Sequence, residues 1–316
     1  MAILETHDLT KVYPTADGPF KAVDQLNLSV NQGEIFGYLG PNGAGKTTTI
    51  RMLLDLIRPT AGRASLLGMD AQADSLAIKR RIGFLPAELA LWKSQKSIEV
   101  VKYVGRIRGG VDMHYVYELA ERLQFDLQKR VKAYSTGNKR KLGLILAMMN
   151  KPDLLMLDEP TSGLDPLMQQ TFNQMMLEVK NEGRTVFLSS HMLSEVQAIC
   201  ERVGVLRSGR LVAVERVDAL THASFKWVKV RFDQIHNIGV SLQRVPGVSD
   251  VSTDEDGRVS LRLTGDFDPL LRAMSDHYVV DLDVEDPSLE EIFLAYYDNQ
   301  VAAPSATNTH AMKELA

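Results

Sequence analysis

The segment Gly40–Thr47, which reads Gly-Pro-Asn-Gly-Ala-Gly-Lys-Thr, constrains the fold of this chain more than any other. It matches the Gly-x-x-x-x-Gly-Lys-Thr phosphate loop, in which glycines let the backbone curl so that its N–H groups point at phosphate oxygens. A strand-like run, Glu34–Leu39, precedes the loop, and Thr48–Ile57 suits a helix that Pro59 terminates. The positive N-terminal end of that helix would face the phosphates. The segment therefore predicts an α/β domain that binds a nucleotide.

Within this loop, two side chains have predicted roles. Lys46 is expected to reach the β- and γ-phosphates, and the Thr47 hydroxyl is expected to hold Mg²⁺. The residues of the loop that we expect to bind nucleotide are Gly40, Asn42, Gly43, Gly45, Lys46, Thr47 and Thr48.

A pair of acids follows a second apolar run, Leu154–Leu157. Asp158 is expected to bind Mg²⁺, usually through water, and Glu159 is expected to orient and deprotonate the attacking water. Taken alone, two acids at a strand end can also be purely structural. Their occurrence together with a phosphate loop favours the catalytic interpretation.

Three stretches together resemble the nucleotide-binding subunits of ABC transporters: GPNGAGKTT, LLMLDEPTSGLDP and LSSH. The resemblance covers residues 3–220 and implies ATP as the nucleotide. It also implies that Ser162–Asp165, including Asp165, communicates across a dimer, that His191 senses the γ-phosphate, and that Tyr13 stacks on adenine. Tyr13 lies in a turn-like Tyr-Pro stretch and could instead pack against the core, and a lone histidine such as His191 is often structural. The end of a β-like run, Thr185–Ser190, is nevertheless where ligands meet an open α/β sheet.

The family's signature loop, Leu-Ser-Gly-Gly-Gln, corresponds here to Tyr134–Asn138, which retains Ser135 and Gly137. The following residues, Lys139–Met149, fit a helix, and a serine with free N–H groups at a helix start suits an anion. In the family that anion is the γ-phosphate of nucleotide held by the other subunit. With one phosphate loop and one signature, the chain is expected to complete two ATP sites only as a homodimer or heterodimer. We expect the basic run Lys139–Lys141 to be a solvated helix edge rather than a phosphate clamp.

The chain departs from the family at Ala87, where a glutamine usually follows the proline and contacts Mg²⁺ or water. Ion coordination would then rest on Thr47, Asp158, phosphate oxygens and water. Glu88 could substitute, or it could be a solvated loop acid. Some drug-exporter-like members look similar at this point, so the resemblance leans toward export. A helical lobe is expected over residues 88–150; its mixed apolar and basic residues suit a lobe core or a groove for a partner helix, and the resemblance implies that membrane subunits dock there.

The charge pattern divides the chain near residue 220. Residues 1–220 have 28 Lys and Arg against 24 Asp and Glu, whereas residues 221–316 have 8 against 16. The acidic part has three runs of alternating apolar residues and two helix-like segments, Ile235–Arg244 and Pro269–Asp276. They predict a small α+β domain over residues 221–300, for which a ferredoxin-like arrangement is one candidate. By analogy with exporter-type ATPases, it would support dimerisation or regulation. Residues 301–316 lack periodicity and are expected to be a disordered tail.

The remaining features limit the class of protein. A net charge of −4 argues against a strongly basic nucleic-acid binder, so no nucleic acid is expected as a partner. No apolar run reaches the roughly 18 residues of a membrane helix, so we expect a soluble, intracellular protein. The single cysteine, Cys200, fits a reducing compartment and is expected in the core rather than as a nucleophile.

Together with the resemblance, these features predict an ATP-hydrolysing subunit on the cytoplasmic face of the cell membrane that drives a separate permease. The alternatives are a soluble ABC-type ATPase of translation or DNA maintenance, or an ATP-binding regulatory module with little hydrolysis. The transported substrate, the permease, the role of the acidic domain and the consequence of Ala87 do not follow from the sequence.

Overall fold

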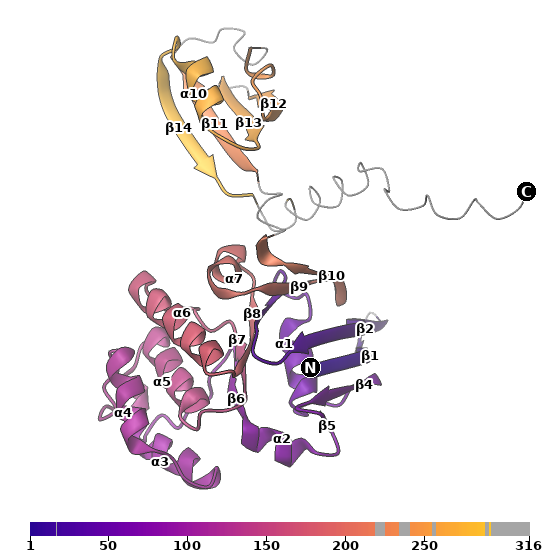
Figure 1. Cartoon of the computed structure of the whole chain (residues 1–316), viewed down its shortest axis with the longest axis vertical. Helices are drawn as coiled ribbons and strands as arrows, with labels where there is room; N and C mark the ends of the chain where they lie inside the picture. Colours follow the sequence, from indigo (N-terminus) through magenta and orange to yellow (C-terminus); the bar gives the residue numbers. More distant parts are fainter. Residues whose placement is uncertain (17, 219–224, 234–240, 255–256, 288–290, 292–316) are drawn as a thin grey trace, which may run out of the picture. The chain divides into compact units, whose positions relative to one another are not determined.

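The computed structural model describes residues 1–16, 18–218, 225–233, 241–254, 257–287 and 291. The chain divides into two compact units, Met1–Asp218 and Ala219–Ala316, and each is described by itself (Figure 1). The tail expected at residues 301–316 lies outside the described residues. No helix within the described ranges is long and apolar enough to cross a lipid bilayer.

A six-stranded sheet with the strand order β10-β9-β3-β8-β7-β6 forms the centre of the first unit. Its neighbouring strands pair in parallel from β6 to β9, and β10 is antiparallel to β9. Every residue of β3, β7 and β8 is buried, which explains their nearly continuous apolar sequences, since helices or a second sheet cover both faces of a parallel sheet. The strands are β3 Ile35–Leu39, β6 Ile82–Leu85, β7 Leu154–Asp158, β8 Thr185–Ser190, β9 Arg202–Arg207 and β10 Arg210–Arg216.

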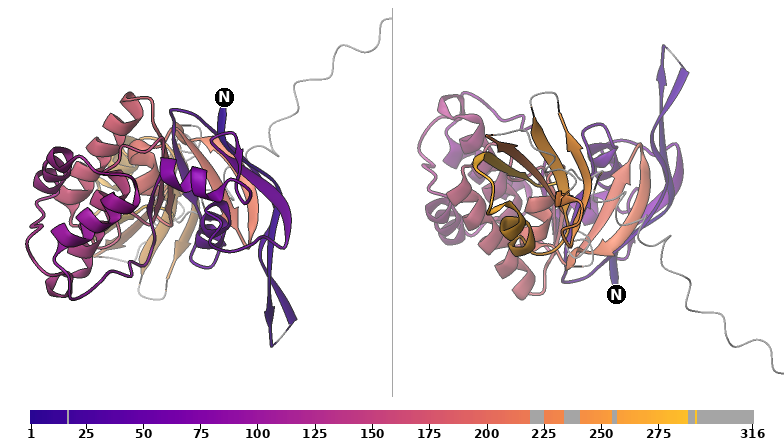
Figure 2. Two further views of the ribbon diagram at one scale, coloured as in Figure 1. Left: turned by 90° about the horizontal axis from the view of Figure 1, so that it is seen from below. Right: turned by 90° about the horizontal axis from the view of Figure 1, so that it is seen from above.

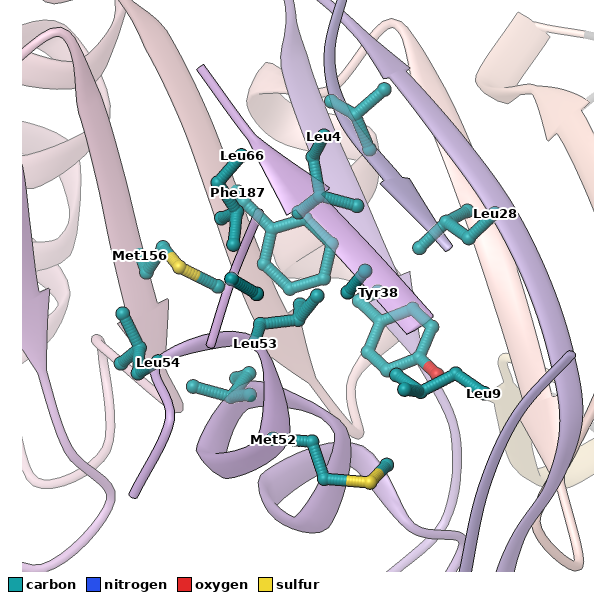
Figure 3. Packing of buried hydrophobic residues seen from close by; sticks show 14 of the residues in the cluster. Leu4, Leu9, Leu28, Tyr38, Met52, Leu53, Leu54, Leu66, Met156 and Phe187 are labelled. Atoms are coloured by element: carbon teal, nitrogen blue, oxygen red, sulfur yellow. The ribbon is translucent and has the colours of Figure 1, made fainter. Parts of the chain in front are cut away.

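An antiparallel sheet with the order β2-β1-β4-β5 faces the central sheet, and helix α1 lies between them (Figure 1). Figure 3 shows Leu53 of α1 packing together with Leu4 of the antiparallel sheet and Phe187 of the central sheet. This apolar core fixes the start of α1 against both sheets. The elements are β1 Ala2–Thr15, β2 Gly18–Asn31, β4 Ala61–Leu66, β5 Met69–Asp70 and α1 Lys46–Leu53.

The β1–β2 hairpin corrects one expectation. Tyr13-Pro14 was expected to be turn-like, but both residues belong to strand β1, and Tyr13 pairs with Phe20 of β2. The turn comes later, between Thr15 and Gly18. Figure 2 shows this long hairpin projecting from the first unit. Local turn signals were therefore overridden by a long antiparallel pairing that the sequence of β1 alone does not reveal.

Helices cover the other face of the central sheet. Helices α5, α6 and α7 contact its strands, and α3 and α4 pack on α5 to form the helical lobe (Figures 1 and 2). The faces of α3 and α4 that pack into the lobe have apolar residues at helical spacing. These buried residues include Val100 and Val101 of α3 and Val116 and Leu119 of α4. The elements are α2 Ser75–Arg81, α3 Ser97–Ile107, α4 Met113–Arg122, the 3₁₀ turn Val131–Ala133, α5 Thr136–Met148, α6 Pro166–Asn181 and α7 Leu193–Ile199.

The second unit contains an antiparallel sheet with the order β12-β13-β11-β14 and helix α10. Val228, Leu261 and Leu270 form part of its core. This strand order agrees with a ferredoxin-like arrangement, which stays a prediction because most of the expected helix Ile235–Arg244 lies outside the described residues. The elements are β11 Lys226–Phe232, β12 Val248–Thr253, β13 Arg258–Leu263, α10 Asp268–Met274 and β14 Val279–Glu285.

Candidate active site

The phosphate loop connects the carboxyl end of β3 to the N-terminus of α1, as its sequence predicts. Gly45 has φ +109°, and a Cβ atom there would lie 2.3 Å from the carbonyl oxygen of Ala22. At Gly40, a Cβ atom would lie 2.4 Å from the carbonyl oxygen of Leu206. A side chain at either position would displace the loop, so neighbouring backbone, as well as the turn itself, requires these glycines.

Lys46 lies inside the loop with only 6% of its surface exposed. Its Nζ donates hydrogen bonds to the carbonyl oxygens of Gly40, at 2.6 Å, and Pro41, at 3.3 Å. The same ammonium lies 3.3 Å from Oε1 of Glu159. Main-chain carbonyls and a carboxylate thus compensate this buried charge, and they hold it where phosphate bound by the loop would meet it.

Asp158 joins three elements through its carboxylate, which is 1% exposed. Oδ2 accepts a hydrogen bond from Thr47 Oγ1 of α1 at 2.8 Å, and Oδ1 accepts one from Ser189 Oγ of β8 at 2.5 Å. The predicted pair of ion ligands, Thr47 and Asp158, is therefore brought together by the fold. Ser189 was missed by sequence reasoning, although it belongs to the LSSH stretch from which only His191 was selected.

Glu159 follows Asp158 in a left-handed backbone conformation, with φ +51°, which is uncommon for a residue other than glycine. Its N–H donates to the carbonyl oxygen of Ser189 at 3.2 Å. Its Oε2 lies 2.8 Å from Nδ1 of His191, while Oε1 is buried and accepts no hydrogen bond from the described part of the chain. The Lys46 ammonium at 3.3 Å is the charged neighbour of Oε1. A carboxylate that lines the cavity beside the phosphate loop is placed to act on a water molecule as a general base.

A cavity of about 360 Å³ lies beside these groups. Tyr13 lines it and is only half-buried, and Phe20, which is 53% exposed, lines it from the paired strand. This exposure favours a ligand-contacting role for Tyr13 over core packing, although stacking on adenine stays a prediction. Phe20 was not selected from the sequence, because its position beside Tyr13 follows from the strand pairing. The lining residues are Tyr13, Phe20, Ala22, Pro41, Asn42, Gly43, Ala44, Gly45, Lys46, Thr47, Thr48, Ala87 and Glu159.

Six predicted site residues do not line this cavity: Gly40, Asp158, His191, Ser135, Gly137 and Asp165. The first three adjoin it through their contacts with Lys46, Thr47 and Glu159, whereas the other three have no such contact in the described part of the chain. Ser135 and Asp165 are exposed and cap helices: Ser135 Oγ accepts from Asn138 N at 3.3 Å, and Asp165 Oδ1 accepts from Met168 N at 3.0 Å. Gly137 packs so closely that a Cβ atom there would lie 2.4 Å from the carbonyl oxygen of Gly163. The signature segment and the segment around Gly163 thus touch each other, and their role at a second subunit's nucleotide stays a prediction.

The basic run after the signature corrects a second expectation. Arg140 was expected at a solvated helix edge, but only 6% of its surface is exposed. Its guanidinium donates to the carbonyl oxygens of Pro86 and Ala87, each at 2.7 Å. Burial lowers the pKa of Arg140. Glu88, in contrast, is exposed and does not line the cavity, as expected for a solvated loop acid.

The site residues fit a magnesium nucleotide. Thr47 and Asp158 supply a hydroxyl and a carboxylate oxygen, which are the kind of ligand that Mg²⁺ prefers. Within the described ranges, no cluster of three or more His, Cys, Asp or Glu side chains could hold a metal ion by itself.

Comparisons with known proteins agree with this geometry. The profile of the ABC transporter family matches residues 23–162. The bacitracin transport ATP-binding protein BcrA of Bacillus licheniformis is 35% identical over 258 residues, which are 81% of this chain and 83% of that protein. The chain belongs to the ABC transporter ATP-binding family. As a member of this family, it is an ATP-binding subunit that hydrolyses ATP.

Further relatives and solved structures agree with this membership. The uncharacterized ABC transporter ATP-binding protein YhaQ of Bacillus subtilis is 33% identical, over 88% of this chain and 94% of that protein. A solved ATP-binding subunit of an ABC transporter superposes with a TM-score of 0.62 and 28% identity, over 69% of this chain and 91% of that chain. The dimeric bacterial cassette MJ0796 has the same fold, with a TM-score of 0.63 and 21% identity over 68% of this chain and 98% of that chain. The predicted family and the phosphate-loop fold of this ABC ATPase are thus confirmed.

Proposed function

We propose that this ABC ATPase drives export through a separate membrane permease, from the cytoplasmic face of the cell membrane. The observation that carries its chemistry is the pair Glu159–His191 at the edge of the phosphate-loop cavity, with the buried Oε1 of Glu159 beside Lys46. Two relatives support export. BcrA is named for bacitracin transport, and YbhF of Escherichia coli is named a probable multidrug ABC transporter ATP-binding protein. YbhF is 34% identical over 69% of this chain and 38% of that protein. The non-transport alternatives have no comparable support.

In this proposal, the residues of the site divide the work of phosphoryl transfer. The N–H groups of the phosphate loop and Lys46 bind the phosphates, and Thr47 with Asp158 would hold Mg²⁺, whose charge offsets that of the phosphates. Glu159 accepts a proton from the attacking water. His191 holds the Glu159 carboxylate in place through Oε2, which leaves Oε1, beside Lys46, as the oxygen that accepts the proton. Ser189 orients Asp158 in the same way, by donating to Oδ1.

The proposed assembly is a dimer in which each signature segment completes the partner's site. Ser135 and Asp165 support it because both are exposed and neither lines the cavity of its own chain. The N-terminus of α5, capped by Ser135, has the partial positive charge that a γ-phosphate would meet. We infer that ATP closes the dimer and hydrolysis reopens it. Both a homodimer and a heterodimer are compatible with this scheme, and the scheme involves no nucleic acid.

The substitution Glu159→Gln tests this mechanism. It preserves the shape of the side chain but removes the base, so turnover of Mg-ATP should fall by about 100-fold or more, while ATP still binds. Light scattering should then show a stable dimer at saturating Mg-ATP. The matched control is Glu88→Gln, which changes an exposed acid outside the cavity and should hydrolyse ATP normally. A Glu159→Gln variant that stays monomeric with ATP would exclude the dimer, and one that hydrolyses ATP normally would exclude Glu159 as the base.

A further inference from the structure

Helix α5 lies unusually close to strand β6 and to the loop after it, residues 86–96. A Cβ atom at Gly83 of β6 would lie 2.1 Å from the carbonyl oxygen of Ala147 in α5. A Cβ atom at Gly143 of α5 would lie 2.5 Å from Leu85 Cδ1 and 2.6 Å from Leu89 Cδ1. Gly83 thus lets the helix approach the strand, because a larger residue there would meet the helix backbone and push the two elements apart. At Gly143 the helix backbone packs against the ends of the two leucine side chains.

This close approach places Arg140 of α5 against the start of the loop. Nη1 donates to the carbonyl oxygen of Pro86 and Nη2 to that of Ala87, each at 2.7 Å. The planar fork of a guanidinium can bind two acceptors at once in a fixed geometry. Asp158 and Glu159 are the acidic groups whose charges act on the guanidinium, and their attraction partly offsets the burial of this cation.

The loop that Arg140 holds is also part of the nucleotide site. Ala87 lines the cavity together with Lys46 and Glu159. Alanine has no side-chain polar group, so only the backbone of this residue can be fixed by hydrogen bonds. The hydrogen bond from Arg140 to the Ala87 carbonyl is therefore a direct link between the wall of the cavity and the helix whose N-terminus is capped by Ser135.

We propose that Arg140 is a positioning residue for ATP hydrolysis: it couples the cavity wall at Ala87 to helix α5 and so transmits nucleotide binding to the helical lobe. This inference rests on the proposed function. It assigns to a buried arginine the link that Ala87 cannot make through its own side chain. In this proposal a change in the loop on ATP binding acts on α5 through the fork, which holds two consecutive carbonyls of the loop.

Steady-state kinetics of Arg140→Met and Arg140→Lys provide the first test. Arg140→Met keeps a long side chain but removes both hydrogen bonds, so kcat should fall at least tenfold while KM for ATP changes less than threefold. Arg140→Lys keeps the charge without the planar fork, and it should restore part of kcat. The control is Lys141→Met, which removes the next basic residue of α5 and should leave kcat and KM unchanged.

The fluorescence of Trp92 provides a readout that does not depend on hydrolysis. Trp92 lies in the same loop, five residues after Ala87, is 51% exposed and packs edge-on against Tyr103 of α3 at a centroid distance of 5.3 Å. In a Glu159→Gln background, Mg-ATP should change its emission, and Arg140→Met should abolish the change at saturating ATP. Trp92→Phe should remove the signal and so identify its source, because the chain has only two tryptophans.

Three results would overturn the proposal. One is a kcat of Arg140→Met equal to that of the wild type. Another is an unchanged Trp92 response in Arg140→Met. The last is a parallel loss of kcat, ATP affinity and thermal stability in both Arg140→Met and Arg140→Lys, which would indicate a structural role only. The proposed function fails separately, through Glu159→Gln, because the Trp92 response requires ATP binding but no hydrolysis.

Discussion

The carboxylate of Glu195 joins two segments next to the proposed catalytic groups, and its removal gives a quantitative prediction. Glu195 of α7 accepts hydrogen bonds from Thr161 Oγ1, through Oε1, and from Ser190 Oγ at 2.5 Å, through Oε2. Thr161 is 4% exposed and Ser190 is fully buried. Thr161 follows Glu159 by two residues, and Ser190 directly precedes His191. One side chain thus links the loop after β7 to the carboxyl end of β8.

A double-mutant cycle of Thr161→Val and Glu195→Ala measures the energy of one of these bonds. A hydrogen bond to a charged group stabilises a protein by about 1.5–3 kcal/mol. Burial of Thr161 limits screening by water, so we expect a coupling energy in this range. In the Glu195→Ala background the Thr161 hydroxyl loses this acceptor, and Thr161→Val should then cost little or even stabilise the protein.

Urea unfolding followed by Trp92 fluorescence is a suitable assay. Trp92 belongs to the first unit, and Trp227→Phe removes the other tryptophan, so the signal reports on the first unit alone. The control cycle pairs Thr161→Val with Glu118→Ala, an exposed acid on α4, and should be additive. A coupling energy for Thr161 and Glu195 below about 0.5 kcal/mol, the usual error of additivity, would refute the assigned hydrogen bond.

Three further predictions concern the loop, the aromatic wall and the thiol. Gly45→Ala should lower the stability of the first unit by about 2 kcal/mol or more and abolish ATP binding, because the new Cβ meets a backbone oxygen. Gly43→Ala has open space around it and should cost about 1 kcal/mol, so equal losses of stability in urea unfolding would contradict this reasoning. Tyr13→Ala should raise KM for ATP about three- to tenfold with little change in kcat, whereas Tyr13→Phe keeps the ring and should behave as wild type. An unchanged KM for Tyr13→Ala would exclude stacking. Burial raises the pKa of the Cys200 thiol, so at pH 8 its thiolate fraction is below that of a free cysteine. A thiol reagent should therefore react about 100-fold more slowly with the native protein than with the protein unfolded in urea, and similar rates in both states would show that Cys200 is accessible.

Each part of the site that was predicted from the sequence is a short continuous segment of the chain. The phosphate loop, the Asp158-Glu159 pair and His191 lie at strand ends, where short apolar runs indicate the strands and the next residues supply the chemistry. Local backbone rules suffice for such segments, since a glycine loop before a lysine has few other uses between a strand and a helix. The same rules misplaced Tyr13 in a turn, because the length of the β1–β2 pairing depends on both strands.

The residues that were missed make contacts between distant segments. Ser189 and Asp158 are 31 positions apart, and Arg140 is more than 50 positions from the carbonyls that it holds. A run of basic residues at the start of a helix usually indicates a solvent-exposed face, so the sequence predicts exposure for all three residues of Lys139–Lys141. Which of the three is buried depends on how closely α5 approaches β6, and Gly83 permits that approach.

The sequence by itself determined the family and the phosphate-loop fold, and it supplied the proposed reacting groups, because each depends on residue types at fixed local spacing. Only the tertiary structure decided which polar side chains are buried and what they bind. Arg140 and Glu195 look like ordinary surface residues of helices until strands and loops far away in the chain supply their partners. The physical reason is that burial makes a hydrogen bond or charge strong, and burial is a property of the packed elements rather than of any single segment.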